Sequence, residues 1–280
     1  MDIKHAVKNK LSYSQETDNK ALSVNTTNAL SRASHGLSLN EKRLIAMSIG
    51  KIDSLKSGFR QHNGQQMRVK ITAQEFSDMF SVSDKSVYRH LINACDNLMK
   101  RYVRIIEKTS KGRKEIKFSW VSGVIYHHGE GWVEIGFSNE ITPHLTLIRG
   151  QYTSYKLNSA TALRSVYSWR LFELFMSVSV IKNDLKGQLY ITLEDFRHSL
   201  EVPDSYKFND IKRRIIEPSC QEINNIHHIK TTWKPSKKGR SITSLLFYFD
   251  KESQQESAPS DEKDNLIAVK RCPDTMDMFG

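Results

Sequence analysis

The chain has 280 residues, enough for one large domain or two ordinary ones, and it carries a formal net charge of +11 at pH 7. No apolar run approaches the length needed to span a bilayer, and the polar N-terminus lacks an apolar signal core, so we expect a soluble, cytoplasmic protein. The three cysteines, Cys95, Cys220 and Cys272, form no CxxC pair and no zinc spacing, which predicts free thiols and no metal site.

Four stretches of different composition divide the chain. We expect residues 1–24 to be a flexible N-terminal segment and residues 251–280 to be a flexible acidic tail. Between them, residues 25–150 and 151–250 form two predicted domains of similar element order. From Asp250 onward the net charge is −4, so the preceding residues carry +15. A body this basic attracts polyanions, nucleic acid first, although ordinary solubility charge is an alternative explanation.

The first domain opens with a predicted helix, because Ser38 and Glu41 form a capping box, and this helix should run to about Ile52. An alternating strand over 67–71 and a short helix over 72–80 follow. The remaining elements are a longer helix over 84–101 and strands over 102–108, 115–127 and 131–138. The apolar stripe of the longer helix comprises Val87, Leu91, Ala94, Cys95 and Leu98.

The second domain repeats this order. Its predicted elements are one long helix over 158–180, a strand over 189–193, helices over 194–200 and 206–225, and strands over 227–233 and 241–250. The buried side of the last helix should comprise Phe208, Ile211, Ile215, Cys220 and Ile223. Pro218 lacks a backbone N–H, so we expect a kink or a new helical start there.

The similarity between the domains extends to single positions. At an offset of 120 residues, the matched pairs include Ile71 with Ile191, Thr72 with Thr192 and Phe76 with Phe196. At an offset of 125 residues, they include Arg89 with Arg214 and Cys95 with Cys220. The loop over 110–113 is also echoed by the loop over 236–240. Matches in the same order with small monotonic shifts indicate an internal duplication.

Helix, strand, helix, turn, helix and hairpin is the order of a winged helix, so we predict an α+β fold of two tandem winged-helix domains. The second helix of a helix-turn-helix element fits the major groove of B-DNA, and a basic hairpin tip would lie against phosphates. Winged helices also serve as plain protein-contact modules, and an exposed basic face can be merely solvated. Two copies, each with a cationic helix face and a cationic hairpin, favour DNA binding.

Helical phase selects the side chains that could reach DNA. In the first domain, those opposite or beside the apolar stripe are Lys85, Ser86, Arg89 and Asn93. In the second domain, Arg213 and Arg214 point away from the buried side, while Lys212 lies nearer to it and Lys207 precedes the helix. The candidates at the hairpin tips are Lys111, Arg113, Lys237, Lys238 and Arg240. Arginine can bond O6 and N7 of guanine together, whereas lysines at a tip suit phosphates.

Several segments carry a resemblance to a known family. "SLNEKRLIAMSIGKI", "ITAQEFSDMF" and "FNDIKRRIIEPSCQEIN" resemble the replication initiators of iteron-containing bacterial plasmids, the group that includes the F-plasmid initiator. The strongest piece is the basic helix "IKRRIIEPSCQEIN", and the resemblance covers residues 24–250.

The resemblance implies two winged-helix domains that grip one DNA repeat, with monomers bound to tandem iterons at a plasmid origin. It implies homodimers, joined through the N-terminal domain, that bind an inverted repeat and repress the protein's own gene, which contributes to copy control. It further implies opening of a nearby A/T-rich stretch and recruitment of the host initiator and replicative helicase. The DNA-reading positions of the family fall on Arg213 and Arg214, with Lys212 beside them, and on Lys85, Ser86 and Arg89 in the first domain.

The acidic tail ends in a segment that resembles the hydrophobic pentapeptide by which bacterial proteins dock on the replicative sliding clamp. Its residues are Thr275, Met276, Asp277, Met278 and Phe279, with threonine in place of the usual glutamine.

We expect no enzymatic activity and no cofactor. The chain has no GxxxxGK[ST] phosphate loop, no His-x-His pair that could serve a nicking tyrosine, and no recognisable base beside a serine or cysteine. The alternative function is a winged-helix transcriptional repressor without a role in replication, because both functions share the same DNA chemistry.

Overall fold

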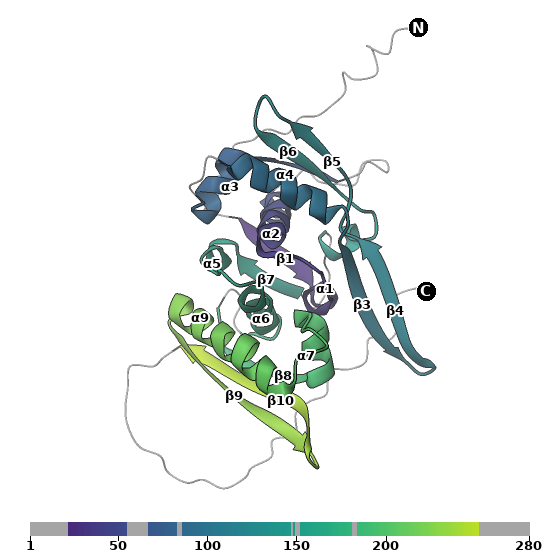
Figure 1. The fold of residues 1–280 in the computed structure, drawn as a ribbon, viewed down its shortest axis with the longest axis vertical. Coiled ribbons are helices and arrows are strands. Elements are labelled where there is room, and N and C mark those ends of the chain that lie inside the picture. The colour runs from purple at the N-terminus through teal and green to yellow at the C-terminus, as the bar shows by residue number, and fades with distance from the viewer. Residues whose placement is uncertain are drawn as a thin grey trace.

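The computed structural model describes residues 22–54, 67–82, 86–146, 148, 152–180 and 184–251. The chain forms two units stacked along the long axis, with the strands β1 (Ser23–Thr27) and β7 (Tyr152–Lys156) and the helix α1 (Asn28–Arg32) between them (Figure 1). Of the predicted site residues, Lys85 and the five residues of the tail pentapeptide lie outside the described ranges. No helix within those ranges is long and apolar enough to cross a membrane.

The first unit is a winged helix. Its elements are α2 (Leu39–Ser54), β2 (Arg68–Thr72), α3 (Ala73–Phe80), α4 (Val87–Leu98), β5 (Val121–His127) and β6 (Trp132–Phe137). The predicted capping box starts α2, because the Ser38 N–H donates to Glu41 Oε2 at 3.1 Å and the Glu41 N–H donates to Ser38 Oγ at 3.5 Å. The strands pair antiparallel in the order β2-β6-β5.

The second unit repeats the plan. Its elements are α6 (Val166–Met176), β8 (Gly187–Thr192), α7 (Leu193–Leu200), α8 (Phe208–Ile211), η4 (Lys212–Ile216), α9 (Glu217–His227), β9 (Ile229–Lys238) and β10 (Ser241–Lys251). Its strands pair in the order β8-β10-β9, which is the order of the first unit. The predicted fold of two tandem winged helices is therefore confirmed.

Two element predictions are corrected. The predicted single helix over 158–180 is two helices, α5 (Asn158–Thr161) and α6, because Ser165 is extended and its hydroxyl caps α6 by accepting the Tyr167 N–H at 3.2 Å. The predicted strand over 115–127 is also divided. It becomes β4 (Gly112–Ser119) and β5, with the buried Trp120 at the break.

The hairpin of β3 (Tyr102–Thr109) and β4 is an insertion in the first unit. It forms its own two-stranded sheet between α4 and β5, whereas in the second unit α9 leads directly into β9. The matched loops over 110–113 and 236–240 are therefore not equivalent, and that sequence interpretation is wrong. The turn between β5 and β6 is the counterpart of the turn between β9 and β10.

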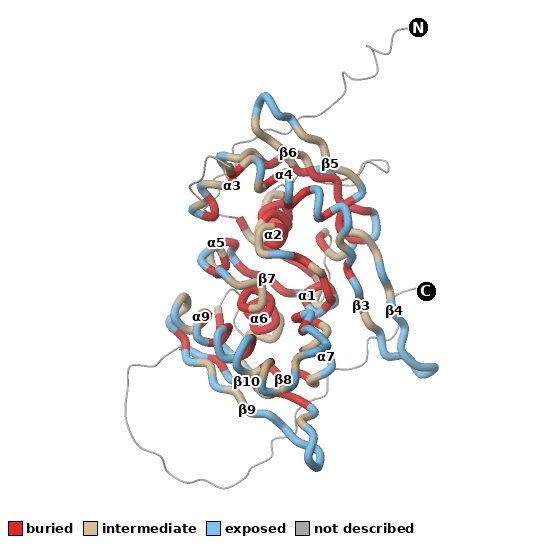
Figure 2. Tube along the Cα trace, in the orientation of Figure 1, coloured by how far each residue is buried: buried red, intermediate tan, exposed pale blue. Residues whose placement is uncertain are grey.

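One hydrophobic core runs through both units (Figure 2). Between them, β1 (Ser23–Thr27) pairs antiparallel with β7 (Tyr152–Lys156), and α1 (Asn28–Arg32) and the 3₁₀ helix η3 (Thr142–His144) flank this pair. The Phe80 ring of the first unit lies 6.4 Å from the Trp169 ring of α6, centroid to centroid. The units therefore share apolar burial, the main stabilising term in folding.

A buried ion cluster also joins α2 to α6. Lys42 Nζ lies 2.7 Å from Glu173 Oε1, Arg170 Nη1 lies 2.8 Å from Glu173 Oε2, and the three side chains are about 95% buried. Burial alone would raise the pKa of the Glu173 carboxyl, but the charges of Lys42 and Arg170 outweigh burial and lower it. Burial lowers the pKa of Lys42 to about 8, although Glu173 favours its charged form. The cluster is thus charged at neutral pH, and each charge has a partner.

Candidate nucleic-acid interface

The second helix of the first helix-turn-helix, α4, buries its predicted apolar stripe completely. Arg89 and Asn93 lie on the exposed side, as the helical phase predicts. Ser86 is half-buried at the N-cap position, with its hydroxyl 3.3 Å from His90 Nε2. The structure therefore places Arg89 and Asn93 on one solvent-facing side of α4, four residues apart.

In the second unit, the helix that is predicted to read DNA, named the second reading helix, is made of α8, η4 and α9. Arg213 and Arg214 are exposed, as predicted, while Ile211 and Ile215 are fully buried. The Arg214 guanidinium lies 5.1 Å from the Tyr206 ring centroid and 3.7 Å from Asp210 Oδ1. Lys212 is half-buried, and its Nζ lies 3.5 Å from Glu217 Oε1. For Arg213, no ion-pair partner lies among the described residues, so its five donors are open to an external acceptor.

The predicted irregularity at Pro218 takes the form of a π-helical turn. Proline has no N–H for the carbonyl four residues earlier, and its ring clashes with that carbonyl in a regular helix. The segment η4 widens the helix just before it, with the Glu217 N–H bonded to the Lys212 carbonyl five residues back. The α-helix then resumes with Pro218 in its first turn. Such turns occur often at functional sites.

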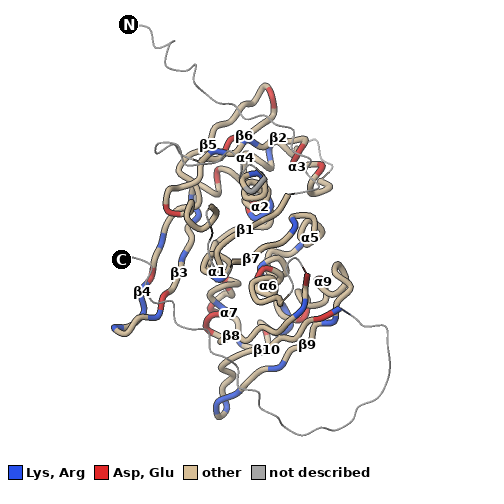
Figure 3. The backbone as a smooth tube through the Cα atoms, turned by 180° about the vertical axis from the view of Figure 1, so that it is seen from behind, with Lys and Arg blue, Asp and Glu red and all other residues tan. Residues whose placement is uncertain are grey.

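The hairpin tip of the second unit is strongly cationic. Lys237, Lys238 and Arg240 are exposed around the turn at Gly239, whose φ of 62° favours glycine. Figure 3 shows Lys and Arg at this tip of β9–β10 and along β3–β4. Lys207 is exposed at the N-cap position of α8, and its backbone N–H donates to Asp210 Oδ2 at 3.2 Å. The β9–β10 tip and the start of α8 thus both present exposed cations on the second unit.

The predicted hairpin residues of the first unit have a different setting. Lys111 is exposed at the β3–β4 tip, but Arg113 Nη1 lies 3.2 Å from Glu194 Oε1 of α7. The topological wing, β5–β6, was missed by the sequence analysis. Its His128 Nδ1 lies 3.3 Å from the Tyr88 hydroxyl of α4. No local signal distinguishes this turn from the loop over 110–113, because each joins two consecutive strands after α4.

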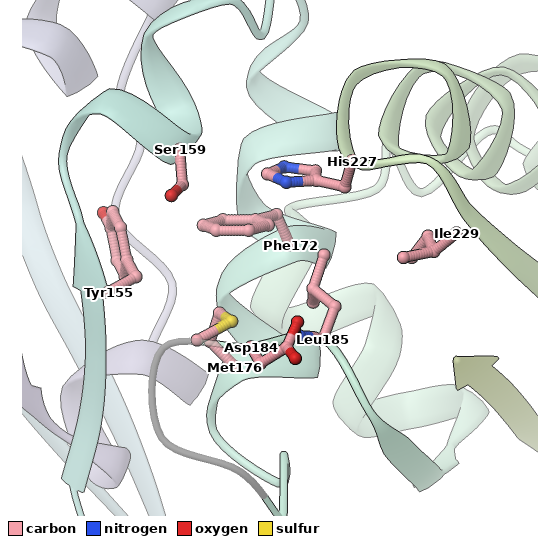
Figure 4. Close-up of a pocket in the computed structure, with 8 residues that line it drawn as sticks. All are labelled: Tyr155, Ser159, Phe172, Met176, Asp184, Leu185, His227 and Ile229. Atoms are coloured by element: carbon pink, nitrogen blue, oxygen red, sulfur yellow. Dashed lines mark hydrogen bonds between the residues drawn. The ribbon is translucent and has the colours of Figure 1, made fainter. Parts of the chain in front are cut away.

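Among the described residues, neither Cys95, Cys220 nor the small cavity beside α6 has the features of a catalytic centre. Cys95 and Cys220 are free and buried, as predicted, and burial raises the pKa of each thiol to about 12, so neither is a thiolate at neutral pH. A cavity of about 50 Å³ lies between α6 and the end of α9, where His227 stacks on Phe172 with ring centroids 5.0 Å apart (Figure 4). This volume suits water rather than an organic ligand. In the described ranges no group of His, Cys, Asp and Glu could hold a metal ion.

Comparisons with known proteins agree with this geometry. Two family models match: "Initiator Replication protein, WH1" over residues 23–176 and "Initiator Rep protein, WH2" over residues 192–249. A replication initiation protein of Escherichia coli is 24% identical over 84% of this chain and 72% of its own. The PI protein of Escherichia coli is 22% identical over 88% of each chain.

Among solved structures, the Pi initiator protein in complex with iteron DNA superposes with a TM-score of 0.66, at 20% identity, over 84% of this chain and 99% of that chain. The similarity to that structure supports the fold alone. The family is shown by the two family models, which together cover most of the chain. This chain belongs to the family of initiator replication proteins with WH1 and WH2 domains.

Proposed function

We propose that this protein initiates plasmid replication by binding directly repeated iterons at an origin as a monomer. The observation that carries the proposal is the duplication of the reading element. Each unit buries one side of its second helix and exposes arginine on the other, at Arg89 and at Arg213 and Arg214. The iteron DNA in the Pi complex supports this choice of target.

The reading helices supply base contacts in this proposal, and the flanking cations hold phosphates. Arg213 and Arg214 suit guanine, and Asn93 suits adenine, because each can make two hydrogen bonds to one base edge. Ser86 and Lys85 are further candidates at the start of α4. The proposed phosphate contacts are Lys111, Lys207, Lys212, Lys237, Lys238 and Arg240. Two linked units raise the effective concentration of the second contact, and several phosphate contacts make the affinity fall with salt.

The remaining proposed roles rest on the resemblance of the sequence to the iteron initiators and of its tail to a clamp-binding peptide. We propose that dimers formed through residues 25–150 bind an inverted repeat and repress the protein's own gene, and that origin-bound monomers recruit the host initiator and helicase. We also propose that residues 275–279 dock on the sliding clamp. Replacement of Phe279 by alanine should then weaken clamp binding and leave DNA binding intact, and absence of clamp binding by the wild-type protein would end this part of the proposal.

The first experiment is selection of binding sites from DNA of the source replicon, followed by footprinting. Several direct repeats beside an A/T-rich stretch support an initiator. A lone inverted repeat at a promoter would instead support the repressor without a replication role. Failure to enrich any sequence would contradict both functions.

A further inference from the structure

The inserted hairpin β3–β4 contacts the second unit along one helix. Its two strands pair over eight positions, and one side of β3 is anchored in the core by Val103 and Ile105. From there the hairpin runs down the side of the molecule toward α7 (Figure 1). In the second unit no such hairpin exists between the reading helix and the next strand. The insertion therefore has a role that the basic winged-helix plan does not require.

Three residues of α7 and its C-cap make these contacts, and their spacing puts them on one face. Glu194 Oε1 pairs with Arg113 Nη1 of β4 at 3.2 Å. His198 Nε2 lies 3.0 Å from the Arg104 carbonyl of β3, which can only accept, so the ring donates. Glu201 accepts the Gly36 N–H at 2.7 Å and the Ser34 hydroxyl. Positions i, i+4 and i+7 lie on one face of a helix, so this face of α7 packs against the first unit.

The contacts of His198 and Glu201 are linked through the first unit. Ser34 and Arg104 form an antiparallel bridge, with N–H to O distances of 3.0 and 2.9 Å. The segment that holds Glu201 is thus bonded to the strand that holds His198. Glu201 itself closes α7 in the left-handed conformation, with a φ of 53°, which turns its backbone away from the helix. The hairpin and residues 34–36 form one continuous binding surface for α7.

The position of α7 affects the second reading helix through the turn that connects them. Arg197 of α7 donates to the Pro203 carbonyl at 3.4 Å and to the Tyr206 carbonyl. Tyr206 packs under Arg214. A shift of α7 would therefore be transmitted to the start of α8 and to the arginines that follow.

We propose that β3–β4 is an arm that fixes α7, and through it the second reading helix, relative to the first, and so sets the spacing between the two half-sites on DNA. This inference rests on the proposed function and deepens it. In this proposal the partner of the Arg113 guanidinium is the Glu194 carboxylate and not a DNA phosphate. The pair is 51% and 68% exposed, so alone it contributes little, and the arm acts through the whole set of contacts.

The test compares wild type with a triple variant, Glu194→Gln, His198→Ala and Glu201→Gln, on duplexes selected by the wild type. The duplexes carry the native spacing between half-sites or one base pair more or less. Wild type should lose about tenfold in affinity per changed base pair, and the variant about twofold, because α7 without these contacts would let the second reading helix adjust to a displaced half-site. An unchanged spacing profile in the variant would overturn the proposal.

The first unit offers a matched control. Gln74 and Asp78 occupy the positions of Glu194 and His198 in α3, and there they bond to each other at 2.8 Å. Their double replacement by alanine should leave the spacing profile as in wild type. A change equal to that of the triple variant would mean that α7 has no special role. Circular dichroism and a thermal melt establish that each variant is folded.

A charge exchange separates the arm from a phosphate contact. In a variant that already carries His198→Ala and Glu201→Gln, where the Arg113–Glu194 pair remains, Arg113→Glu should broaden the spacing profile further, and adding Glu194→Arg should reverse that further change. If Arg113 binds phosphate, the charge-exchanged variant stays weak on every duplex and its salt dependence remains reduced, which would contradict the arm. If wild type selects no DNA at all, the proposed function itself fails, and that outcome is distinct from an unchanged profile.

Discussion

The two units share one strand order but present different chemistry around their reading helices. The turn of β9–β10 is a run of exposed cations over residues 237–240, whereas the matching turn of β5–β6 carries histidine, glycine and glutamate over residues 127–130. The second reading helix exposes two adjacent arginines and contains a π turn, and α4 is regular with Arg89 and Asn93 exposed. In the proposed DNA complex we therefore expect a division of labour, in which the second unit supplies most of the sequence reading and the first unit positions it.

The largest expected effect comes from the double variant Arg213→Ala and Arg214→Ala. Two lost base contacts at about 1–3 kcal/mol each should reduce specific affinity by roughly 30-fold or more while non-specific binding persists. Quantitative binding to selected and scrambled duplexes measures this. The matched variant in the first unit, Arg89→Ala with Asn93→Ala, should have a smaller effect, and equal losses would break the proposed division of labour.

The next effect concerns the joint between the units. Glu173→Gln should destabilise the protein by about 3–5 kcal/mol, because Lys42 and Arg170 would remain buried with one carboxylate charge missing. Chemical denaturation measures the free energy of unfolding. Glu107→Gln removes an exposed partner of Lys114 and should change stability by under about 1 kcal/mol. If the two variants are equally stable, the buried cluster is not what joins the units.

A smaller effect should distinguish the two hairpin turns. Removing Lys237, Lys238 and Arg240 should weaken binding to all sequences alike and reduce the slope of log affinity against log salt by about 0.9 per lost phosphate contact. Replacement of His127 and His128 by alanine should leave that slope unchanged, because the turn over residues 127–130 contains no lysine or arginine. A salt slope that falls equally in both variants would show that both turns bind phosphate.

The smallest predicted effect is a pH dependence set by His35. Burial first, then the charges of Arg170 and Lys42, lower the pKa of this fully buried imidazole well below its ordinary value. The unfolded chain then binds the proton first, so stability is full above about pH 6.5 and falls below it, by about 1 kcal/mol at pH 5.5. Denaturation at pH 7.5 and 5.5 measures the loss, which should shrink in His35→Gln. An equal loss in the variant would assign the effect to other groups.

Features that depend on a few neighbouring residues could be predicted from the sequence. The capping box at Ser38 and Glu41, the apolar stripe of α4 and the exposure of Arg213 and Arg214 all follow from periodicity and capping. The break before α6 depends on one backbone conformation at Ser165, which the surrounding apolar residues hide.

The β3–β4 insertion could not be predicted in the same way. A basic loop between two strands has the same sequence pattern whether it is a wing or an arm, and only the strand order distinguishes them. The pair of Arg113 with Glu194 joins residues 81 positions apart. Such a contact is set by tertiary packing, and no local signal marks it.

The π turn has a consequence for how the two halves of the chain are aligned. As far as Ile215, which lies within η4, the buried residues Val87 and Leu91 correspond to Ile211 and Ile215, an offset of 124. After η4, Cys95 and Leu98 correspond to Cys220 and Ile223, an offset of 125. A turn closed by a bond to the fifth residue back holds one residue more than an α turn. The one-residue gap therefore lies between Ile215 and Cys220, so Arg89 aligns with Arg213 and His90 with Arg214, and the match of Arg89 with Arg214 at an offset of 125 is shifted by one residue. Comparisons of homologous sequences that forbid gaps within helices would misalign the very side chains proposed to read DNA.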